Sequence, residues 1–269
     1  MALHRVLDPD FDLAEGQPAE ILGEEAHHAV RVKRLQVGDA LELLDGRGTI
    51  ALARVELVEK VSKGAWRLLA RVERCESAAP VRPWVEVWSA TPKGGRVEGL
   101  IEQLSQVGAA VWRPLQSVRT IVDPREGKLD RLERVARESA KQCGRAHVLR
   151  VGTRASFAQA LREPDALGVR PITLIALIGG RSIADALAPV RAGERPLSVR
   201  LLVGPEGDWT DQERDEALVS GAVGVGLGPH AMRTETAAVM IAGLTVALLS
   251  GRDSDGDHPA SATPTGGGL

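Results

Sequence analysis

The sequence contains no tyrosine, only two phenylalanines and only two cysteines among its 269 residues. With so few of these aromatic rings, the core must be built mainly from leucine, valine, isoleucine and alanine. Cys75 and Cys143 lie far apart and outside any C-x-x-C pattern, which argues against a disulfide scaffold or a zinc site and fits a reducing cytosol. We therefore expect a cytoplasmic protein with no metal centre.

Long hydrophobic runs are also absent. No apolar window reaches the roughly 18 residues that a membrane span needs. The N-terminal stretch MALHRVLDPD has no cationic segment followed by an apolar one, so no signal peptide is predicted. These features predict a protein without a membrane partner.

Charge is spread unevenly along the chain, whose length suits one large or two modest domains. The formal net charge is −2. Residues 76–150 carry 13 basic and 9 acidic side chains, whereas residues 151–269 carry 10 basic and 14 acidic ones. If an anionic partner binds, the middle third is the expected contact.

The first 75 residues predict a small, mostly antiparallel β domain. DALELLD, TIALARVELVE and AWRLLARVERC alternate apolar and polar residues, with the turn signals DGRG and SKG between them. EEAHHAVRVKRL predicts one short helix inside this domain. Two prolines in residues 76–83 predict a linker there. The tail at 251–269 has no apolar pattern, so we expect it to be disordered.

Residues 84–250 predict a second domain in which strands and helices alternate. Strands are expected at 84–90, 111–117, 172–180, 199–204 and 222–228, and helices at 95–108, 127–145, 182–190, 210–221 and 233–250. Such alternation is typical of an α/β fold, in which helices cover both faces of a parallel sheet.

Three consecutive strands of this sheet end in glycine-rich turns, LIGGRS, LVGPEGDWT and LGPHAMRTETA. Ligands of open parallel sheets bind at the carboxyl ends of the strands, and glycine lets the backbone approach a ligand closely. One such turn is usually a plain connection, but three in neighbouring strands favour a binding site. No turn matches a Walker loop or a G-x-G-x-x-G dinucleotide motif, and Glu206 would repel a phosphate. A neutral or cationic ligand therefore fits better.

These turns also carry a family resemblance. LLVGPEGDWTDQE, followed by VGLGPHAMRTETAA, closely resembles the signature of the ribosomal RNA small subunit methyltransferase E family. PKGGRVEGLIEQLSQVGA and ESAKQCGR follow in the family's order, and HHAVRVKRLQVGD is similar to part of the family's PUA-like domain. The resemblance implies methylation of uridine N3 in 16S rRNA with S-adenosylmethionine as cofactor. It also implies a SPOUT-type parallel sheet with a C-terminal trefoil knot, preceded by a small PUA-like β-barrel domain that binds RNA.

The resemblance also implies which residues bind the cofactor. In SPOUT proteins, the turns that correspond to 177–181, 203–207 and 227–233 wrap it. The residues expected to bind S-adenosylmethionine are Leu177, Ile178, Gly179, Val203, Gly204, Pro205, Glu206, Gly207, Leu227, Gly228, Met232, Arg233 and Thr236.

Five positions depart from the family's usual pattern. Asp208 stands where the family has a second glycine, and His230 where it has an arginine. Gln103, Gln106 and Thr120 also differ from the family's usual residues. We interpret these as divergence within an active family. Asp208 and His230 are the two positions at which cofactor affinity or RNA contact would be altered.

The chemistry suggests catalytic roles for three residues. A uridine N3 carries a proton near neutral pH, so the reaction needs a base or a group that stabilises the uridine anion. Arg233, a permanent cation at a helix start, is the candidate for anion stabilisation, with a phosphate or carboxylate clamp as the alternative. Glu206 and Glu235 are expected to orient Arg233 or to act as the base, although carboxylates at helix starts also interact favourably with the helix dipole.

RNA contact is predicted for a set of basic residues. At 100° per residue, five cations of the 127–145 helix lie within one sector, opposite an apolar face: Arg131, Arg134, Arg137, Lys141 and Arg145. A solvated charged face is the alternative interpretation, but nearby arginines favour phosphate contact, which is not sequence specific. The predicted RNA-binding residues are Arg31, Lys33, Arg34, Arg119, Arg131, Arg134, Arg137, Lys141 and Arg145.

The predicted partners are 16S rRNA in the small ribosomal subunit and a second copy of the chain, but neither a membrane nor DNA. A homodimer through the last helix is implied by the resemblance, and the all-round apolar stretch GLTVALLS is consistent with it. Two alternatives remain open at this point. One is a SPOUT enzyme that methylates another RNA position, such as a ribose 2′-hydroxyl, and the other is a ribosome-binding module without catalytic activity.

Overall fold

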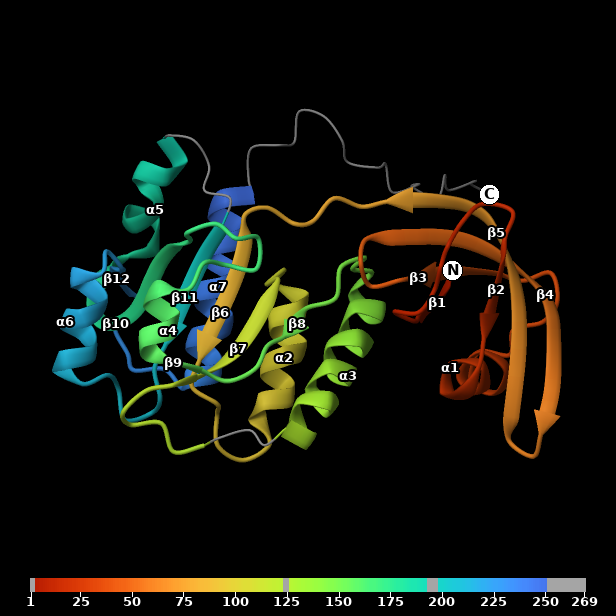
Figure 1. The fold of residues 1–269 in the computed structure, drawn as a ribbon, viewed down its shortest axis with the longest axis horizontal. Helices are drawn as coiled ribbons and strands as arrows, with labels where there is room; N and C mark the ends of the chain where they lie inside the picture. The colour runs from red at the N-terminus through yellow and green to blue at the C-terminus, as the bar shows by residue number, and fades with distance from the viewer. Residues whose placement is uncertain (1–2, 123–125, 193–197, 251–269) are drawn as a thin grey trace, which may run out of the picture.

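The computed structural model describes residues 3–122, 126–192 and 198–250. Figure 1 shows two β-sheets beside each other, each with its own helices. The predicted disordered tail at 251–269 lies outside the described residues. In the part of the chain that is described, no helix combines the length and the apolar character needed to cross a membrane.

The N-terminal sheet has five strands in the order β1-β3-β4-β5-β2. Its strands are β1 (His4–Leu7), β2 (Pro18–Ile21), β3 (Ala40–Leu44), β4 (Thr49–Ser62) and β5 (Ala65–Ser77). All pairs are antiparallel except β1 with β3. The mostly antiparallel β unit predicted for residues 1–75 is therefore present. Strand β5 continues to Ser77 and so takes in the first two residues of the predicted linker.

One continuous helical stretch covers this sheet. It consists of α1 (Gly23–His27) and a π-helical turn, η1 (His28–Val32). Ala26 and Ala29 are fully buried in the core of the sheet, together with Val6 and Leu41. The short helix predicted from EEAHHAVRVKRL is thus present, but it begins one residue earlier and ends three residues sooner.

The C-terminal sheet is parallel throughout, in the order β12-β10-β11-β6-β7-β8, with β9 paired to β7. Its strands are β6 (Trp84–Ser89), β7 (Val111–Gln116), β8 (Arg150–Val151), β9 (Ala155–Ser156), β10 (Ile172–Ser182), β11 (Ser198–Val203) and β12 (Val223–Gly226). The three strands that carry the glycine-rich turns, β10, β11 and β12, are neighbours at one side of the sheet.

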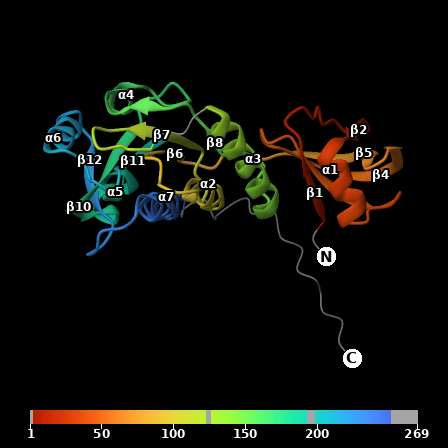
Figure 2. The same ribbon diagram turned by 90° about the horizontal axis from the view of Figure 1, so that it is seen from below.

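Five helices connect these strands, and a sixth, α7, follows the last one. They are α2 (Arg96–Gln106), α3 (Glu126–Cys143), α4 (Phe157–Arg162), α5 (Ile183–Ala192), α6 (Asp211–Val219) and α7 (Thr234–Ser250). Helices α2, α3, α5 and α7 pack on one face of the sheet, and α4 and α6 lie on the other (Figure 2). The strands alternate accordingly, since Val85 and Val87 of β6 face the first set of helices and Trp88 faces the second. The α/β fold with helices on both faces is therefore confirmed.

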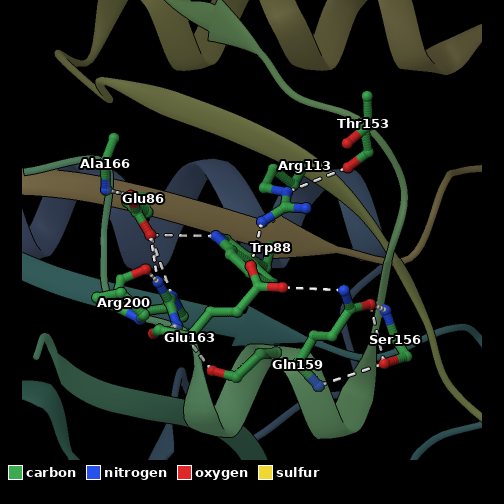
Figure 3. Close-up of polar contacts among 11 residues, drawn as sticks. Glu86, Trp88, Arg113, Thr153, Ser156, Gln159, Glu163, Ala166 and Arg200 are labelled. Carbon is green, nitrogen blue, oxygen red and sulfur yellow. Dashed lines mark hydrogen bonds and ion pairs between the residues drawn. The ribbon is translucent and has the colours of Figure 1, made fainter. Parts of the chain in front are cut away.

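The α4 face of the sheet contains a buried ion pair (Figure 3). Arg200 of β11 contacts Oε2 of Glu86 on β6 through Nε at 3.0 Å and Nη2 at 2.8 Å. Both side chains are almost fully buried, with 1% and 3% of their surface exposed. The remaining guanidinium hydrogens bond to the carbonyl oxygens of Ala160, Glu163 and Pro164. Every donor of this buried cation therefore has an acceptor.

Trp88 completes this cluster. The guanidinium groups of Arg200 and Arg113 each lie 4.2 Å from the centroid of its ring, and its Nε1 donates to Glu86. Arg113 also pairs with Glu163, which follows α4 (Figure 3). The cluster thus joins β6, β7 and β11 to the α4 segment, and β11 leads directly into the Gly-Pro-Glu-Gly turn.

The two domains meet where β1 of the first contacts α3 of the second. Arg5 of β1 pairs with Glu42 and donates to the carbonyl oxygen of Lys141 on α3. Next to it, the imidazole of His4 is half-buried and stacks on His28, with 5.5 Å between ring centroids. Burial, followed by charge interactions with His28, Lys33 and Lys141, holds the pKa of His4 at about 4, below its usual 6.5.

The low pKa of His4 predicts a pH-dependent stability. Because the unfolded chain binds a proton at His4 near pH 6.5 and the folded chain only near pH 4, stability is lost as the pH falls through that window. His4→Phe keeps the ring and removes the titration, and His4 Nε2 is buried without a hydrogen-bond partner. Between pH 7 and 4.5, urea unfolding of the wild type should lose about 1 kcal/mol more than that of the variant, allowing for partial solvent screening. Equal losses would contradict this role of His4.

Candidate methyl-donor pocket

One pocket lies at the carboxyl ends of β11 and β12 and beside a bulge that follows Ala176 within β10, where the three glycine-rich turns meet. Nine of the residues predicted to bind the cofactor line it: Leu177, Ile178, Val203, Gly204, Pro205, Glu206, Leu227, Gly228 and Met232. Parallel neighbouring strands end at the same edge of a sheet, so segments about 20 to 50 positions apart in sequence converge there. The structure therefore brings the predicted turns to one site.

Four predicted cofactor residues are not among the residues that line the pocket. Gly179 follows the lining residue Ile178, while Gly207 packs against the side chain of Arg119. Arg233 and Thr236 are exposed at the start of α7. The lining instead includes residues that the sequence did not single out as cofactor ligands: Ala176, Asp208, Trp209, His230, Ala231, Thr234 and Ala237.

Trp209 holds the first two turns together. Its indole is 1% exposed, and Nε1 donates to the carbonyl oxygen of Ala176 at the end of the regular part of β10. A Cβ on Gly204 would lie only 3.0 Å from the same indole, so a larger residue there would have to displace the ring slightly. Trp209 is thus a structural support of the pocket.

Three further contacts fix the β11–α6 turn. Thr234 Oγ1, at the start of α7, donates to the carbonyl oxygen of Gly204 at 3.0 Å. Thr210 and Glu213 form the predicted capping box at the start of α6. Glu213 Oε1 also accepts from the backbone N–H of Val118, which ties the segment after β7 to this turn.

The first turn is a bulge within β10. Strand β10 pairs with β12 up to Ala176, shifts register, and pairs again from Arg181. At the crossing, a Cβ on Gly180 would lie 2.6 Å from the carbonyl carbon of Val225 and 2.7 Å from the nitrogen of Gly226. The two backbones therefore touch at Gly180, and no side chain fits between them.

Gly180→Ala is expected to lower the free energy of unfolding by about 2 kcal/mol or more, because the clash is with backbone atoms that cannot rotate away. The matched control is Gly99→Ala in α2, where a Cβ meets nothing within 4 Å and alanine favours the helix by up to about 1 kcal/mol. Urea denaturation of both variants measures the effect. A cost at Gly180 below about 0.5 kcal/mol would show that the crossing is looser than described.

The electrostatics of the pocket favour a cationic ligand. Glu206 and Asp208 line it, and no lysine or arginine is found among its described lining residues. Apolar side chains supply much of the remaining wall, including Leu177, Val203 and Leu227. A sulfonium compound, which has an apolar body and a positive centre, fits these lining residues better than a phosphate does.

The backbone at Asp208 explains why the turn tolerates this departure from the family pattern. Its backbone φ is +60°, in the left-handed region where glycine is usual and aspartate is among the better tolerated residues. Its Oδ1 accepts from the backbone N–H of Trp209 at 2.8 Å, which offsets part of the strain. The turn therefore keeps a glycine-like backbone although the glycine is gone.

Arg96 is a site residue that our sequence analysis missed. It lies in the first turn of α2, and its Nη1 is 3.1 Å from Glu235 Oε1 while its Nη2 is 3.6 Å from Glu206 Oε1. The two candidate catalytic carboxylates are therefore joined through Arg96, and no contact of either with Arg233 is found among the described residues. The expectation that they orient Arg233 is wrong in this structure. The motif PKGGRVEG, after another strand end, was the available signal.

Arg233 is exposed and has no ion-pair partner among the described residues. Its carbonyl oxygen accepts from Ala237 N and so opens α7, between the lining residues Met232 and Thr234. This position leaves its guanidinium available to a bound substrate beside the pocket.

Three predicted RNA-binding residues are engaged within the protein. Lys141 pairs with Glu138 and with Glu25 of the N-terminal domain, and only 14% of its side chain is exposed. Arg145 is half-buried and donates to the carbonyl oxygen of Ser105 at 2.9 Å. Arg119 donates to the carbonyl oxygens of Gly207 and Trp209 and so supports the turn between β11 and α6. The prediction that Lys141 and Arg145 face outward is wrong. Lys141 pairs with the N-terminal domain, and α3 ends at Cys143, before Arg145.

The other predicted RNA-binding residues lie at or near the surface. Arg31, Lys33 and Arg34 are exposed on and after η1. On α3, Arg131 pairs with Glu98 at 2.9 Å, Arg134 is exposed, and Arg137 is half-buried.

Comparison with known proteins agrees with this arrangement. A family model described as an RNA methyltransferase domain matches residues 79–246, and one described as an RNA methyltransferase PUA domain matches residues 21–61. The Ribosomal RNA small subunit methyltransferase E of Mycobacterium bovis is 35% identical over 246 residues, which cover 89% of this chain and 90% of that protein. The chain belongs to the ribosomal RNA small subunit methyltransferase E family.

Solved structures show the same fold. A probable rRNA-methyltransferase from Porphyromonas gingivalis has a TM-score of 0.77 and 27% identity, and the match covers 92% of this chain and 99% of that one. A Ribosomal RNA small subunit methyltransferase E from Neisseria gonorrhoeae, bound to S-adenosyl methionine, has a TM-score of 0.76 and 24% identity, with 91% and 96% covered. The family resemblance and the N-terminal PUA domain expected from the sequence are confirmed, and the trefoil knot stays a prediction.

Proposed function

We propose that this member of the methyltransferase E family transfers a methyl group from S-adenosylmethionine to N3 of a specific uridine in 16S rRNA of the small ribosomal subunit. The observation that carries the proposal is the convergence of three glycine-rich turns on one pocket, in a chain of this family. The relative from Neisseria gonorrhoeae, which has the same fold, binds S-adenosyl methionine.

The pocket suits this cofactor. When bound, S-adenosylmethionine supplies an electrophilic methyl group on a positively charged sulfur. Glu206 and Asp208 complement that charge, while Leu177, Val203 and Leu227 provide an apolar wall. Backbone groups of the three turns offer donors and acceptors for the remaining polar atoms. The residues present therefore fit the cofactor by charge and by polarity.

The chain's own residues would act mainly by positioning. Methyl transfer is an in-line displacement, so alignment of the acceptor nitrogen contributes several kcal/mol. Uridine N3 must lose its proton before it attacks, and the exposed cation of Arg233 would stabilise the resulting anion. Glu206 and Glu235 remain the candidates for the proton acceptor, and Arg96 positions both carboxylates.

RNA would contact both domains, which we propose to span residues 1–75 and 84–250 around a linker at 76–83. Arg31, Lys33 and Arg34 present cations on the PUA domain, and Arg131, Arg134 and Arg137 present them on α3. Such contacts would bind phosphates without reading sequence. Selection of the target base would require the uridine to be unstacked and placed beside Arg233.

The proposed assembly is a homodimer that acts in the cytoplasm. Met240 and Leu244, one turn apart on α7, are 36% and 38% exposed, and they form an exposed apolar stripe on this helix. A second copy of α7 would cover this stripe. Sedimentation equilibrium would give twice the chain mass of 28.6 kDa if the proposal is right and the single mass if it is wrong.

The deciding experiment is labelled-methyl transfer to undermethylated small subunits, followed by nucleoside analysis. The proposal predicts label in N3-methyluridine. Label in a ribose 2′-O-methyl group would instead support a methyltransferase that acts on another RNA position. No incorporation, with RNA binding retained, would support a ribosome-binding module without catalytic activity.

A further inference from the structure

A second cleft lies between the two domains. It is at the opposite end of the parallel sheet from the pocket formed by the three glycine-rich turns. It has a volume of about 710 Å³, within the usual range for ligand sites. Trp84 and Arg150, which line it, are the first residues of β6 and β8, so the cleft lies at the amino ends of the strands. Figure 1 shows the turn between β3 and β4 reaching the upper end of α3 here, and Arg47 of that turn bridges to His147.

The cleft has an excess of positive charge. Four arginines line it, Arg47, Arg137, Arg145 and Arg150, against two carboxylates, Asp45 and Glu133. Asp45 is already engaged, because it accepts from the backbone N–H groups of Arg47 and Thr49 and lies 3.6 Å from Arg47 Nε. Glu133 is thus the one lining carboxylate left for three further cations.

Three of these arginines have no carboxylate partner among the described residues. Arg137 is half-buried and Arg150 is exposed, and neither forms an ion pair there. Arg145 donates to one carbonyl oxygen, while its buried Nε has no acceptor. Burial lowers the pKa of Arg145 below its ordinary value, and the interaction with Cys143 offsets only part of that effect. An anionic ligand in the cleft would supply the missing charge for all three.

A polymer fits the cleft better than a small anion does. The cations come from separate segments, with Arg47 on the β3–β4 turn, Arg137 on α3 and Arg150 on β8. Arg150 lies 5.4 Å from the ring centroid of Trp84 and presents an exposed guanidinium, a group on which RNA bases commonly stack. Val81 and Leu167 add exposed apolar surface to the walls.

We propose that this interdomain cleft binds a phosphodiester strand of the RNA substrate, away from the uridine that is methylated. The inference rests on the proposed function, which makes RNA the polyanion in question. The cleft then joins the PUA domain and the methyltransferase domain on one RNA strand, because Arg47 of the first domain and Arg137 and Arg150 of the second would contact the same strand.

The test compares two double variants of the full chain by filter binding to in-vitro-transcribed 16S rRNA across a potassium chloride series. The cleft variant is Arg137→Gln with Arg150→Gln. The matched control is Arg74→Gln with Arg162→Gln, which removes the same charge at exposed arginines that already pair with Glu76 and Glu216. Calorimetry with S-adenosylmethionine checks that both variants keep an intact donor site.

The cleft variant should bind the RNA at least about tenfold more weakly, and the slope of log affinity against log salt should become shallower by about 1.5. The control should match the wild type. Equal affinity and slope for the cleft variant and the control would overturn the proposal. Full displacement of RNA from the wild type by millimolar inorganic phosphate at constant ionic strength would also overturn it, because that result indicates a site for a small anion.

This binding assay does not depend on methyl transfer. If the wild type forms no N3-methyluridine but the cleft variant still loses RNA affinity, the proposed chemistry fails and the cleft proposal stands. If the wild type forms N3-methyluridine and the cleft variant binds RNA normally, the proposed chemistry stands and the cleft proposal fails.

Discussion

Replacing Arg233 by alanine is expected to lower the rate of methyl transfer by about a hundredfold or more, while S-adenosylmethionine binds nearly as before. The substitution removes a preorganised cation that stabilises the negative charge developing on uridine. Loss of one comparable stabilising group in other enzymes lowers the rate by about 10²–10³-fold. Cofactor affinity should change little, because Arg233 lies beside the pocket and is not among its lining residues. Single-turnover methyl transfer to small subunits and calorimetry with the cofactor measure the two effects separately.

Two further variants separate this role from general RNA binding. Arg233→Lys keeps the charge and should recover part of the rate, whereas Arg162→Ala removes an exposed arginine of α4 and should leave the rate unchanged. If Arg233 merely held an RNA phosphate, saturating RNA would restore the rate of the alanine variant. Full activity of Arg233→Ala would exclude any catalytic role for this residue.

The second large effect is expected at the buried ion pair. Arg200→Met should lower the free energy of unfolding by about 3–5 kcal/mol, because it leaves Glu86 as a buried charge without its partner. The carbonyl oxygens of Ala160, Glu163 and Pro164 lose their donors in the same substitution. Urea denaturation measures this loss. Because β11 carries the Gly-Pro-Glu-Gly turn, cofactor affinity should also fall.

An exposed ion pair and a double variant serve as controls. Arg131→Met breaks the pair with Glu98, in which the arginine side chain is 67% exposed, and should cost less than about 1 kcal/mol. The double variant Glu86→Leu with Arg200→Met removes both charges, so its cost should be smaller than the sum of the two single costs. A cost for Arg200→Met that matches that of Arg131→Met would mean that the buried pair contributes little.

Much of the fold could be predicted because its long elements carry clear periodicity. The last helix was expected at 233–250 and spans Thr234–Ser250, and the strand expected at 111–117 spans Val111–Gln116. The elements that were missed are short. Strands β1 and β2 have four residues each, β8 and β9 have two, and α4 has six, too few for an apolar pattern to repeat. Their positions depend on pairing with distant segments.

The pocket was predictable in outline because parallel strands bring their carboxyl ends to one edge. What could not be predicted is how distant side chains support it. Arg96 reaches Glu206 and Glu235 from α2, and Trp209 reaches back to Ala176. These contacts depend on the packing of separate elements, which sequence spacing does not encode.

The same limit explains the misplaced cations of α3. Helical geometry placed Lys141 and Arg145 in the outward sector. However, α3 ends at Cys143 and Gly144 has a φ of +74°, so Arg145 does not follow the helix. Helical geometry also did not include the N-terminal domain, whose Glu25 pairs with Lys141, or α2, whose Ser105 accepts from Arg145. A helix at a domain boundary has two buried sides, so a single apolar stripe predicts only one of them.

The most direct test of the whole account is a crystal structure of the chain grown with S-adenosylmethionine. We expect density for the cofactor between residues 177–179, 203–207 and 227–232, with its sulfonium near Glu206 or Asp208 and its methyl group facing Arg233. Cofactor bound away from these turns, or these turns rearranged so that they no longer share a pocket, would contradict the account.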